Sequence, residues 1–352
     1  CRPGVSSFRF MLARACLMDR EVVLDASPQL QRRPIGPLVR ALQLLGADIS
    51  YVNKEGFAPV RIRPSPEFGT KTHEITLQSG VSSQYITALL LIAPKLPRGI
   101  TIHLTEEPVS ASYIQMTLSM LQYFGISCHW TDRDIRVEPG QYQAKDYAVE
   151  VEWSAASYFY SMVALAENAD IQIEGLNQQS IQGDAVVQSI YESMNVETIW
   201  KEKGIQLLKK KGERVRELNY DFSSCPDIAQ TVMVTMAGLG MTGKLSGLKT
   251  LRIKETDRIA SMQTELARVK TTLEIKEAKG NISCILTGKA KWKDRAKFET
   301  YEDHRMAMAL APLSCLNPIV MKNPEVVSKS YPGFWKDVET IGLKIEKIRI
   351  KG

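Results

Sequence analysis

Two short stretches of the sequence crowd charged side chains against apolar ones, KETDR at residues 254–258 and YEDHRMAM at residues 301–308. Each lies where an apolar run with helical spacing starts, so each is predicted to begin a helix. A helix start needs only one capping side chain, and a cation placed there opposes the helix dipole. A bound anion would offset that local cost. The two stretches are therefore candidates for an anion-binding site.

Other polar residues stand at the starts of further predicted helices. Taken alone, each is more often a plain N-cap or a solvated charge than a ligand-binding group. Taken together, free N–H groups and guanidinium side chains make a site for more than one anion, because guanidinium binds phosphate and carboxylate in a bidentate manner. The candidates are Arg33, Ser82, Ser83, Gln84, Ser110, Asp227, Lys254, Arg258, Arg305 and Lys329.

The elements that carry these residues recur along the chain. Five amphipathic segments end in a similar way, each followed by short strand-like segments, and the residues at which they stop lie 70 to 79 positions apart. Such a period predicts copies of one structural unit. Four of the five stop residues tolerate the left-handed conformation of a helix C-cap, and the lysine is the exception. The stop residues are Gly46, Gly125, Asn195, Lys270 and Gly342.

Within one period the pattern predicts a strand, a helix, a second strand, a second helix and a hairpin. The clearest copy places these at residues 74–78, 82–93, 99–105, 112–124 and 126–139. The other copies are predicted to follow the same order, including a strand at 149–153 and a last strand at 343–348. The expected fold class is therefore α/β, built of βαβαββ units.

The first copy opens at its first helix, residues 6–17, without the strand that begins the unit. A sheet that leaves an edge and an apolar face uncovered is unfavourable. We therefore expect the chain to begin inside a larger protein, with five of six units present.

Composition narrows the function classes. With 352 residues, 44% hydrophobic and 24% charged, the chain is expected to form a soluble protein of two domains. The longest apolar run, residues 86–94, is far shorter than a membrane span, and the basic run at 209–211 lacks the interleaved aromatics of a nucleic-acid surface. The six cysteines form no CxxC pair, so neither a metal site nor a disulfide framework is predicted. We expect a cytoplasmic location and no nucleic-acid or membrane partner.

The two charged stretches resemble the KETDR and DHRMAM motifs of the EPSP synthase family of enolpyruvyl transferases. The resemblance continues through GVSSQYITALLL, RRPIGPLV, VEWSAASYF, NQQSIQGD, PDIAQTVMV and KSYPGFW, in the family's order and over essentially the whole chain. It implies a two-domain inside-out α/β barrel. Residues 1–151 would form an upper domain with two of its three units, and residues 152–352 a lower domain with three. We expect a monomer.

The resemblance also implies a reaction and its residues. The family transfers the enolpyruvyl group of phosphoenolpyruvate to the 5-hydroxyl of shikimate 3-phosphate, and no metal or organic cofactor is implied. Shikimate 3-phosphate would be bound by Ser82, Ser83, Gln84, Ser110, Tyr113, Asp227 and Lys254. Phosphoenolpyruvate would be bound by Arg33, Gln84, Arg258, Arg305 and Lys329. The catalytic residues would be Asp227, Glu255 and Lys254.

Two other functions are compatible with the same fold. One is UDP-N-acetylglucosamine enolpyruvyl transfer, but that enzyme typically carries a reactive loop cysteine, and residues 18–31 contain none. The other is anion binding without turnover. The sequence departs from the family pattern at several positions, such as VSSFR at residues 5–9 where GTAMR is common. Such departures are compatible with a loss of activity and also with variation between lineages.

Overall fold

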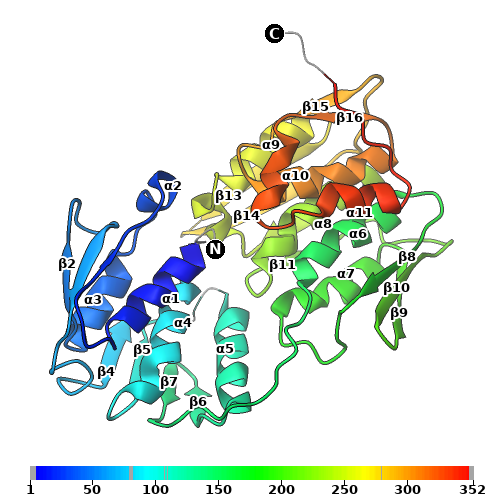
Figure 1. Cartoon of the computed structure of the whole chain (residues 1–352). Helices are drawn as coiled ribbons and strands as arrows, with labels where there is room; N and C mark the ends of the chain where they lie inside the picture. The colour runs from blue at the N-terminus through cyan, green and yellow to red at the C-terminus, as the bar shows by residue number, and fades with distance from the viewer. Residues whose placement is uncertain (1–4, 79–81, 107, 109, 279, 349–352) are drawn as a thin grey trace. The chain divides into compact units, whose positions relative to one another are not determined.

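The computed structural model describes residues 5–78, 82–106, 108, 110–278 and 280–348. The chain divides into two compact units, Cys1–Ala148 and Val149–Gly352, each of which mixes helices with sheets (Figure 1). The α/β class predicted from the sequence is confirmed. Among the described residues, no helix is long and apolar enough to cross a membrane.

The first unit contains two sheets and the helices that cover them. One sheet has the order β1-β3-β2 and the other β4-β5-β7-β6, in which β4 and β5 are parallel and the remaining pairs antiparallel. Helix α4 packs against both α1 and α5 (Figure 1). The bounds are α1 Val5–Ala15, β1 Val22–Leu24, α2 Pro28–Gln31, α3 Gly36–Leu44, β2 Asp48–Tyr51, β3 Val60–Arg63, β4 Glu74–Leu77, α4 Ser83–Ile92, β5 Ile100–Leu104, α5 Ala111–Tyr123, β6 Cys128–Thr131 and β7 Asp134–Val137.

The described residues of the second unit form three sheets. Their orders are β8-β10-β9, β11-β12-β14-β13 and β15-β16, so the four-stranded sheets of the two units have the same pattern of pairing. Short 3₁₀ helices precede several of the α-helices. The bounds are α6 Trp153–Leu165, β8 Asp170–Glu174, α7 Val187–Glu192, β9 Val196–Lys201, β10 Gly204–Lys209, β11 Tyr220–Asp221, α8 Ala229–Leu239, β12 Gly243–Ser246, α9 Arg258–Ala267, β13 Thr272–Ala278, β14 Asn281–Thr287, β15 Ala296–Phe298, α10 His304–Leu310, β16 Ile319–Met321 and α11 Phe334–Thr340.

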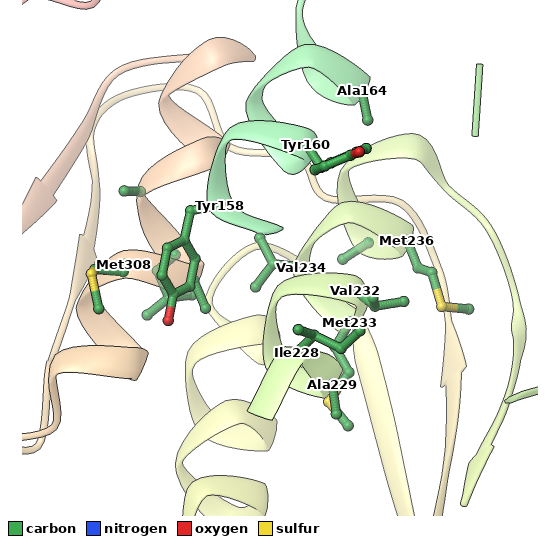
Figure 2. Close-up of a cluster of buried hydrophobic side chains, with 14 of the residues drawn as sticks. Tyr158, Tyr160, Ala164, Ile228, Ala229, Val232, Met233, Val234, Met236 and Met308 are labelled. Carbon is green, nitrogen blue, oxygen red and sulfur yellow. The ribbon is translucent and has the colours of Figure 1, made fainter. Parts of the chain in front are cut away.

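Helices α6, α8 and α10 form the core of the second unit. They are apolar on nearly every side, which is the pattern of a helix surrounded by protein. Figure 2 shows Tyr158 and Tyr160 from α6, Val232 and Met236 from α8, and Met308 from α10 in this cluster, and each is at most 2% exposed. Because each fully buried side chain of this kind contributes about 1.5–3 kcal/mol, the first residues of the three helices are held in fixed places.

All five residues at which the amphipathic helices were predicted to end have positive φ angles. Lys270, which was the exception by residue type, is one of them. The φ angles are +97° at Gly46, +82° at Gly125, +63° at Asn195, +63° at Lys270 and +101° at Gly342. At Lys270 the conformation costs about 1–2 kcal/mol because of its Cβ. The next N–H, that of Thr271, donates to the carbonyl of Leu266 at 3.1 Å and closes the Schellman motif.

Two predicted strands are wrong. Residues 149–152 form no strand, and α6 starts at Trp153. The Glu150 carboxylate instead accepts hydrogen bonds from the Ser180 hydroxyl at 2.5 Å and the Ile181 amide at 3.2 Å. The segment is therefore held by side-chain hydrogen bonds and not by the backbone hydrogen bonds of a paired strand. Residues 343–348 also form no strand, because Lys344 and the described residues after it are exposed and no face is buried against a partner.

Candidate active site

Three cationic side chains of the second unit contact Asp227. It lies in the 3₁₀ helix Pro226–Ile228 that leads into α8, and its side chain is 13% exposed. Its Oδ1 is 3.4 Å from Lys254 Nζ and 3.4 Å from Arg258 Nη1, and its Oδ2 is 3.2 Å from Arg305 Nη2. The structure therefore brings together four predicted site residues from the starts of α8, α9 and α10.

Arg258 is buried among carboxylates. It is 2% exposed, its Nε is 2.7 Å from Asp303 Oδ2, and its Nη2 is 2.7 Å from Glu255 Oε2. Burial raises the pKa of the Asp303 carboxyl, but the Arg258 charge, the hydrogen bond from Arg258, the neighbouring His304 and the Arg305 amide together bring it below its ordinary value. Asp303 also caps α10 by accepting from the Arg305 amide at 2.8 Å. Through Asp303, α9 and α10 are therefore tied at their first turns.

Arg305 lies beside a pocket of about 270 Å³ in the second unit. Its Nη2 is 3.2 Å from Glu152 Oε1, and its Nη1 donates to the Tyr158 hydroxyl at 3.4 Å. Glu152 and Tyr158 line the same pocket, together with Tyr331. Burial raises the pKa of the Tyr158 phenol to about 12, so this hydroxyl stays protonated. The pocket thus offers a cation and a neutral donor side by side.

Lys329 contacts the residue before Asp303. It lies at the end of the 3₁₀ helix Pro324–Lys329, not at the start of a helix as predicted. Its Nζ donates to the carbonyl of Glu302 at 2.9 Å. Tyr301 and Glu302 have φ angles of +53° and +56°, so two successive non-glycine residues are left-handed immediately before Asp303. Such strain is found at functional sites, where surrounding contacts hold it in place.

Several buried polar atoms of the second unit have no hydrogen-bond partner among the described residues, and they include Asp184 Oδ1 and His304 Nδ1. Burial, with a further contribution from Asp227, raises the pKa of Asp184 to about 7. Burial and then the charge of Arg305 lower the pKa of His304, because a cationic imidazole is disfavoured beside that guanidinium. Asp184 is one of the polar residues at the starts of predicted helices, but no substrate or catalytic role was predicted for it. In the part of the chain that the structure describes, no three His, Cys, Asp or Glu side chains group as metal ligands would.

The first unit has a separate polar cluster built on Arg9. This side chain is 6% exposed and its Nη1 donates to Gln84 Oε1 at 2.6 Å and to Ser82 Oγ at 3.4 Å. Its guanidinium carbon lies 4.5 Å from the centre of the Tyr85 ring, and Nη2 donates to the Tyr85 hydroxyl at 3.2 Å. The Ser82 hydroxyl also caps α4 by accepting from the Gln84 amide at 3.4 Å. Arg9 therefore connects α1 to two predicted site residues. Its position near a helix start was noted from the sequence pattern, but no substrate was assigned to it.

The remaining candidates of the first unit lie around the same helices. Ser83 is the first residue of α4, and Tyr113 lies in the first turn of α5. Ser110 is buried with a left-handed φ of +62° before α5. Burial lowers the pKa of the Arg9 guanidinium below its ordinary value, and the positive charge of Arg33 lowers it further. Neighbouring cations of this kind are typical of an anion site.

Known proteins resemble this chain along nearly its whole length. The family model described as EPSP synthase (3-phosphoshikimate 1-carboxyvinyltransferase) matches residues 1–338. A 3-phosphoshikimate 1-carboxyvinyltransferase of Bacteroides fragilis is 42% identical over 346 residues, which cover 97% of this chain and 82% of the relative. One from Haemophilus influenzae is 32% identical over 346 residues, covering 96% and 78%.

A solved structure, that of an EPSP synthase from Acinetobacter baumannii, has the same fold. The TM-score is 0.76 at 22% sequence identity, and the match covers 97% of this chain and 78% of that one. The fold match to this solved structure is consistent with the sequence matches to the two relatives. This chain belongs to the EPSP synthase family.

Proposed function

We propose that this chain carries out the reaction of its family, the transfer of the enolpyruvyl group of phosphoenolpyruvate to the 5-hydroxyl of shikimate 3-phosphate. The observation that carries the proposal is the cluster around Asp227, in which Lys254, Arg258 and Arg305 all lie within 3.4 Å of one carboxylate. Cations and a base in one place suit a reaction between two anions in which a hydroxyl must lose its proton.

Phosphoenolpyruvate is assigned to Arg33, Gln84, Arg258, Arg305 and Lys329. Arg305 and Lys329 are the best supported, because Arg305 lines the pocket of the second unit and the exposed Lys329 contacts the Glu302 carbonyl close to it. Arg258 can accept an anion only if the ligand replaces its 3.4 Å contact with Asp227, since its other nitrogens are held by Asp303 and Glu255.

Shikimate 3-phosphate is assigned to Ser82, Ser83, Gln84, Ser110, Tyr113, Asp227 and Lys254. In the first unit the support is a set of hydroxyl donors at the starts of α4 and α5, with Arg9 holding Ser82 and Gln84 in place. Hydroxyls and free N–H groups at helix starts are suited to a phosphate.

The chemistry divides into addition and elimination. The 5-oxygen forms a bond to the central carbon of the enolpyruvyl group while Asp227 takes the hydroxyl proton, and an acid protonates the terminal methylene carbon. The tetrahedral intermediate then loses a methyl proton as the carbon–oxygen bond to phosphate breaks. We assign Lys254 and Glu255 to these proton transfers. Lys254 Nζ lies 3.4 Å from Asp227, and Glu255 lies 2.7 Å from Arg258, so both belong to the same charged cluster as the proposed base.

The architecture proposed for this function is an inside-out α/β barrel of βαβαββ units, with domains at residues 1–151 and 152–352. It is supported by the shared order of the sheets β4-β5-β7-β6 and β11-β12-β14-β13, in which a helix follows each of the first two strands along the chain. A monomer is the proposed state, and sedimentation of the full-length protein would test it.

Phosphate release by the full-length protein tests the function. We expect release only when phosphoenolpyruvate and shikimate 3-phosphate are both present. Release with UDP-N-acetylglucosamine as acceptor would favour the rival enolpyruvyl transfer. Binding of both ligands without release would favour the non-catalytic alternative.

A further inference from the structure

A buried carboxylate that the proposed chemistry does not use lies two turns beyond the start of α9. The side chain of Glu265 is 0% exposed. Its Oε1 accepts from the Tyr301 hydroxyl at 2.7 Å, and its Oε2 accepts from the Glu299 amide at 3.1 Å and lies 3.0 Å from Arg268 Nε. A buried charge needs several such partners to be tolerated. Two of the three come from one segment, the residues just before α10.

Glu265 and Arg258 face that segment from the same side of α9. They are seven residues apart, which places them on one helix face. Arg258 holds Asp303 at 2.7 Å, and Glu265 holds Tyr301 at 2.7 Å. Residues 299–303 are therefore tied to α9 at both ends by buried charged groups.

The segment held by Glu265 and Arg258 contains a strained turn, in which Tyr301 and Glu302 have φ angles of +53° and +56°. A left-handed residue with a side chain costs about 1–2 kcal/mol and persists only where its neighbours hold it. The turn presents the Glu302 carbonyl to Lys329 Nζ at 2.9 Å and leads directly to Asp303 and Arg305. Movement of this turn would therefore displace the two cations assigned to phosphoenolpyruvate.

We propose that Glu265 is a positioning residue for phosphoenolpyruvate: it holds the strained turn at Tyr301 and Glu302 and thereby places Lys329 and Arg305. The inference rests on the proposed function for the identity of the ligand. It predicts that weakening the contact between Glu265 and Tyr301 raises the KM for phosphoenolpyruvate while the KM for shikimate 3-phosphate changes little. The reason is that the turn holds Lys329 through the Glu302 carbonyl and leads into Arg305, and both cations are assigned to the first substrate.

The test compares Glu265→Gln and Tyr301→Phe in the full-length protein with Tyr191→Phe as a matched control. Tyr191 is a fully buried phenol in the second unit, whereas Tyr301 is partly buried; its hydroxyl is 2.7 Å from the Thr235 hydroxyl, and it is far in sequence from the turn. Loss of one buried hydrogen bond corresponds to about a tenfold change, so Tyr301→Phe and Glu265→Gln should raise the KM for phosphoenolpyruvate about tenfold. Tyr191→Phe should lower the melting temperature without this change.

A double-mutant cycle separates positioning from general destabilisation. If Glu265 acts through Lys329, the combined Glu265→Gln and Lys329→Ala variant should raise the KM for phosphoenolpyruvate by much less than the product of the single effects. An unchanged KM in Tyr301→Phe and Glu265→Gln, or effects that multiply, would overturn the inference. If Lys329→Ala and Arg305→Ala themselves left this KM unchanged, the substrate assignment would fail instead.

Discussion

Replacing Asp227 by asparagine should abolish turnover while leaving the fold intact. Arg258 keeps its 2.7 Å ion pairs with Asp303 and Glu255, whereas the ion pairs that Asp227 itself makes are longer, at 3.2–3.4 Å. We therefore expect the free energy of unfolding to change by about 1 kcal/mol. A general base contributes about 10²–10⁴-fold, so kcat should fall by at least about 100-fold.

Steady-state phosphate release, with each substrate varied in turn, measures this effect. Because the substitution removes a negative charge from among three cations, the KM for phosphoenolpyruvate should stay the same or fall while kcat collapses. Asp221→Asn is the control, since this exposed carboxylate of the same unit accepts from the Ser223 amide at 2.8 Å and takes no part in the site. More than a tenth of the wild-type turnover in Asp227→Asn would remove Asp227 from the catalytic residues.

The same cluster of charges leads to three further predictions. Arg305→Ala and Lys329→Ala should weaken phosphoenolpyruvate much more than shikimate 3-phosphate in calorimetry, and equal losses would show that these cations act through the general field. Asp303→Asn should lower the free energy of unfolding by about 3–5 kcal/mol in urea titrations, because Arg258 stays buried with a weakened partner; an unchanged midpoint would contradict this. The pKa of Asp184 is raised from 3.8 to about 7 in the folded state, so the folded protein binds more protons between these values and stability should fall as pH rises through this range. Asp184→Asn should remove that slope in urea midpoints measured at several pH values, and an unaltered slope would exclude Asp184 as its source.

Local chemistry explains which elements could be predicted. The helix stops at Gly46, Gly125 and Gly342 were predictable because glycine adopts positive φ without a Cβ clash. Lys270 adopts the same conformation only because its neighbours close the motif, which its own residue type does not reveal. The alternating pattern at residues 149–152 is a property of one segment, whereas a strand needs a second segment to pair with, and none of the described residues pairs with it as a strand.

The chain by itself determined the residue types of the site, their places at helix starts and, through its motifs, the family. Only the tertiary structure decided which of them meet. Asp227 and Arg305 are 78 positions apart in the sequence, yet Arg305 and Lys254 both lie within 3.4 Å of the Asp227 carboxylate because α8, α9 and α10 pack in one core. The roles of Arg9 and Glu265 depend on partners 75 and 36 residues away, which the sequence around each of them does not reveal. Such side chains are interpretable only in three dimensions, since burial turns an ordinary charge into one that must be paired.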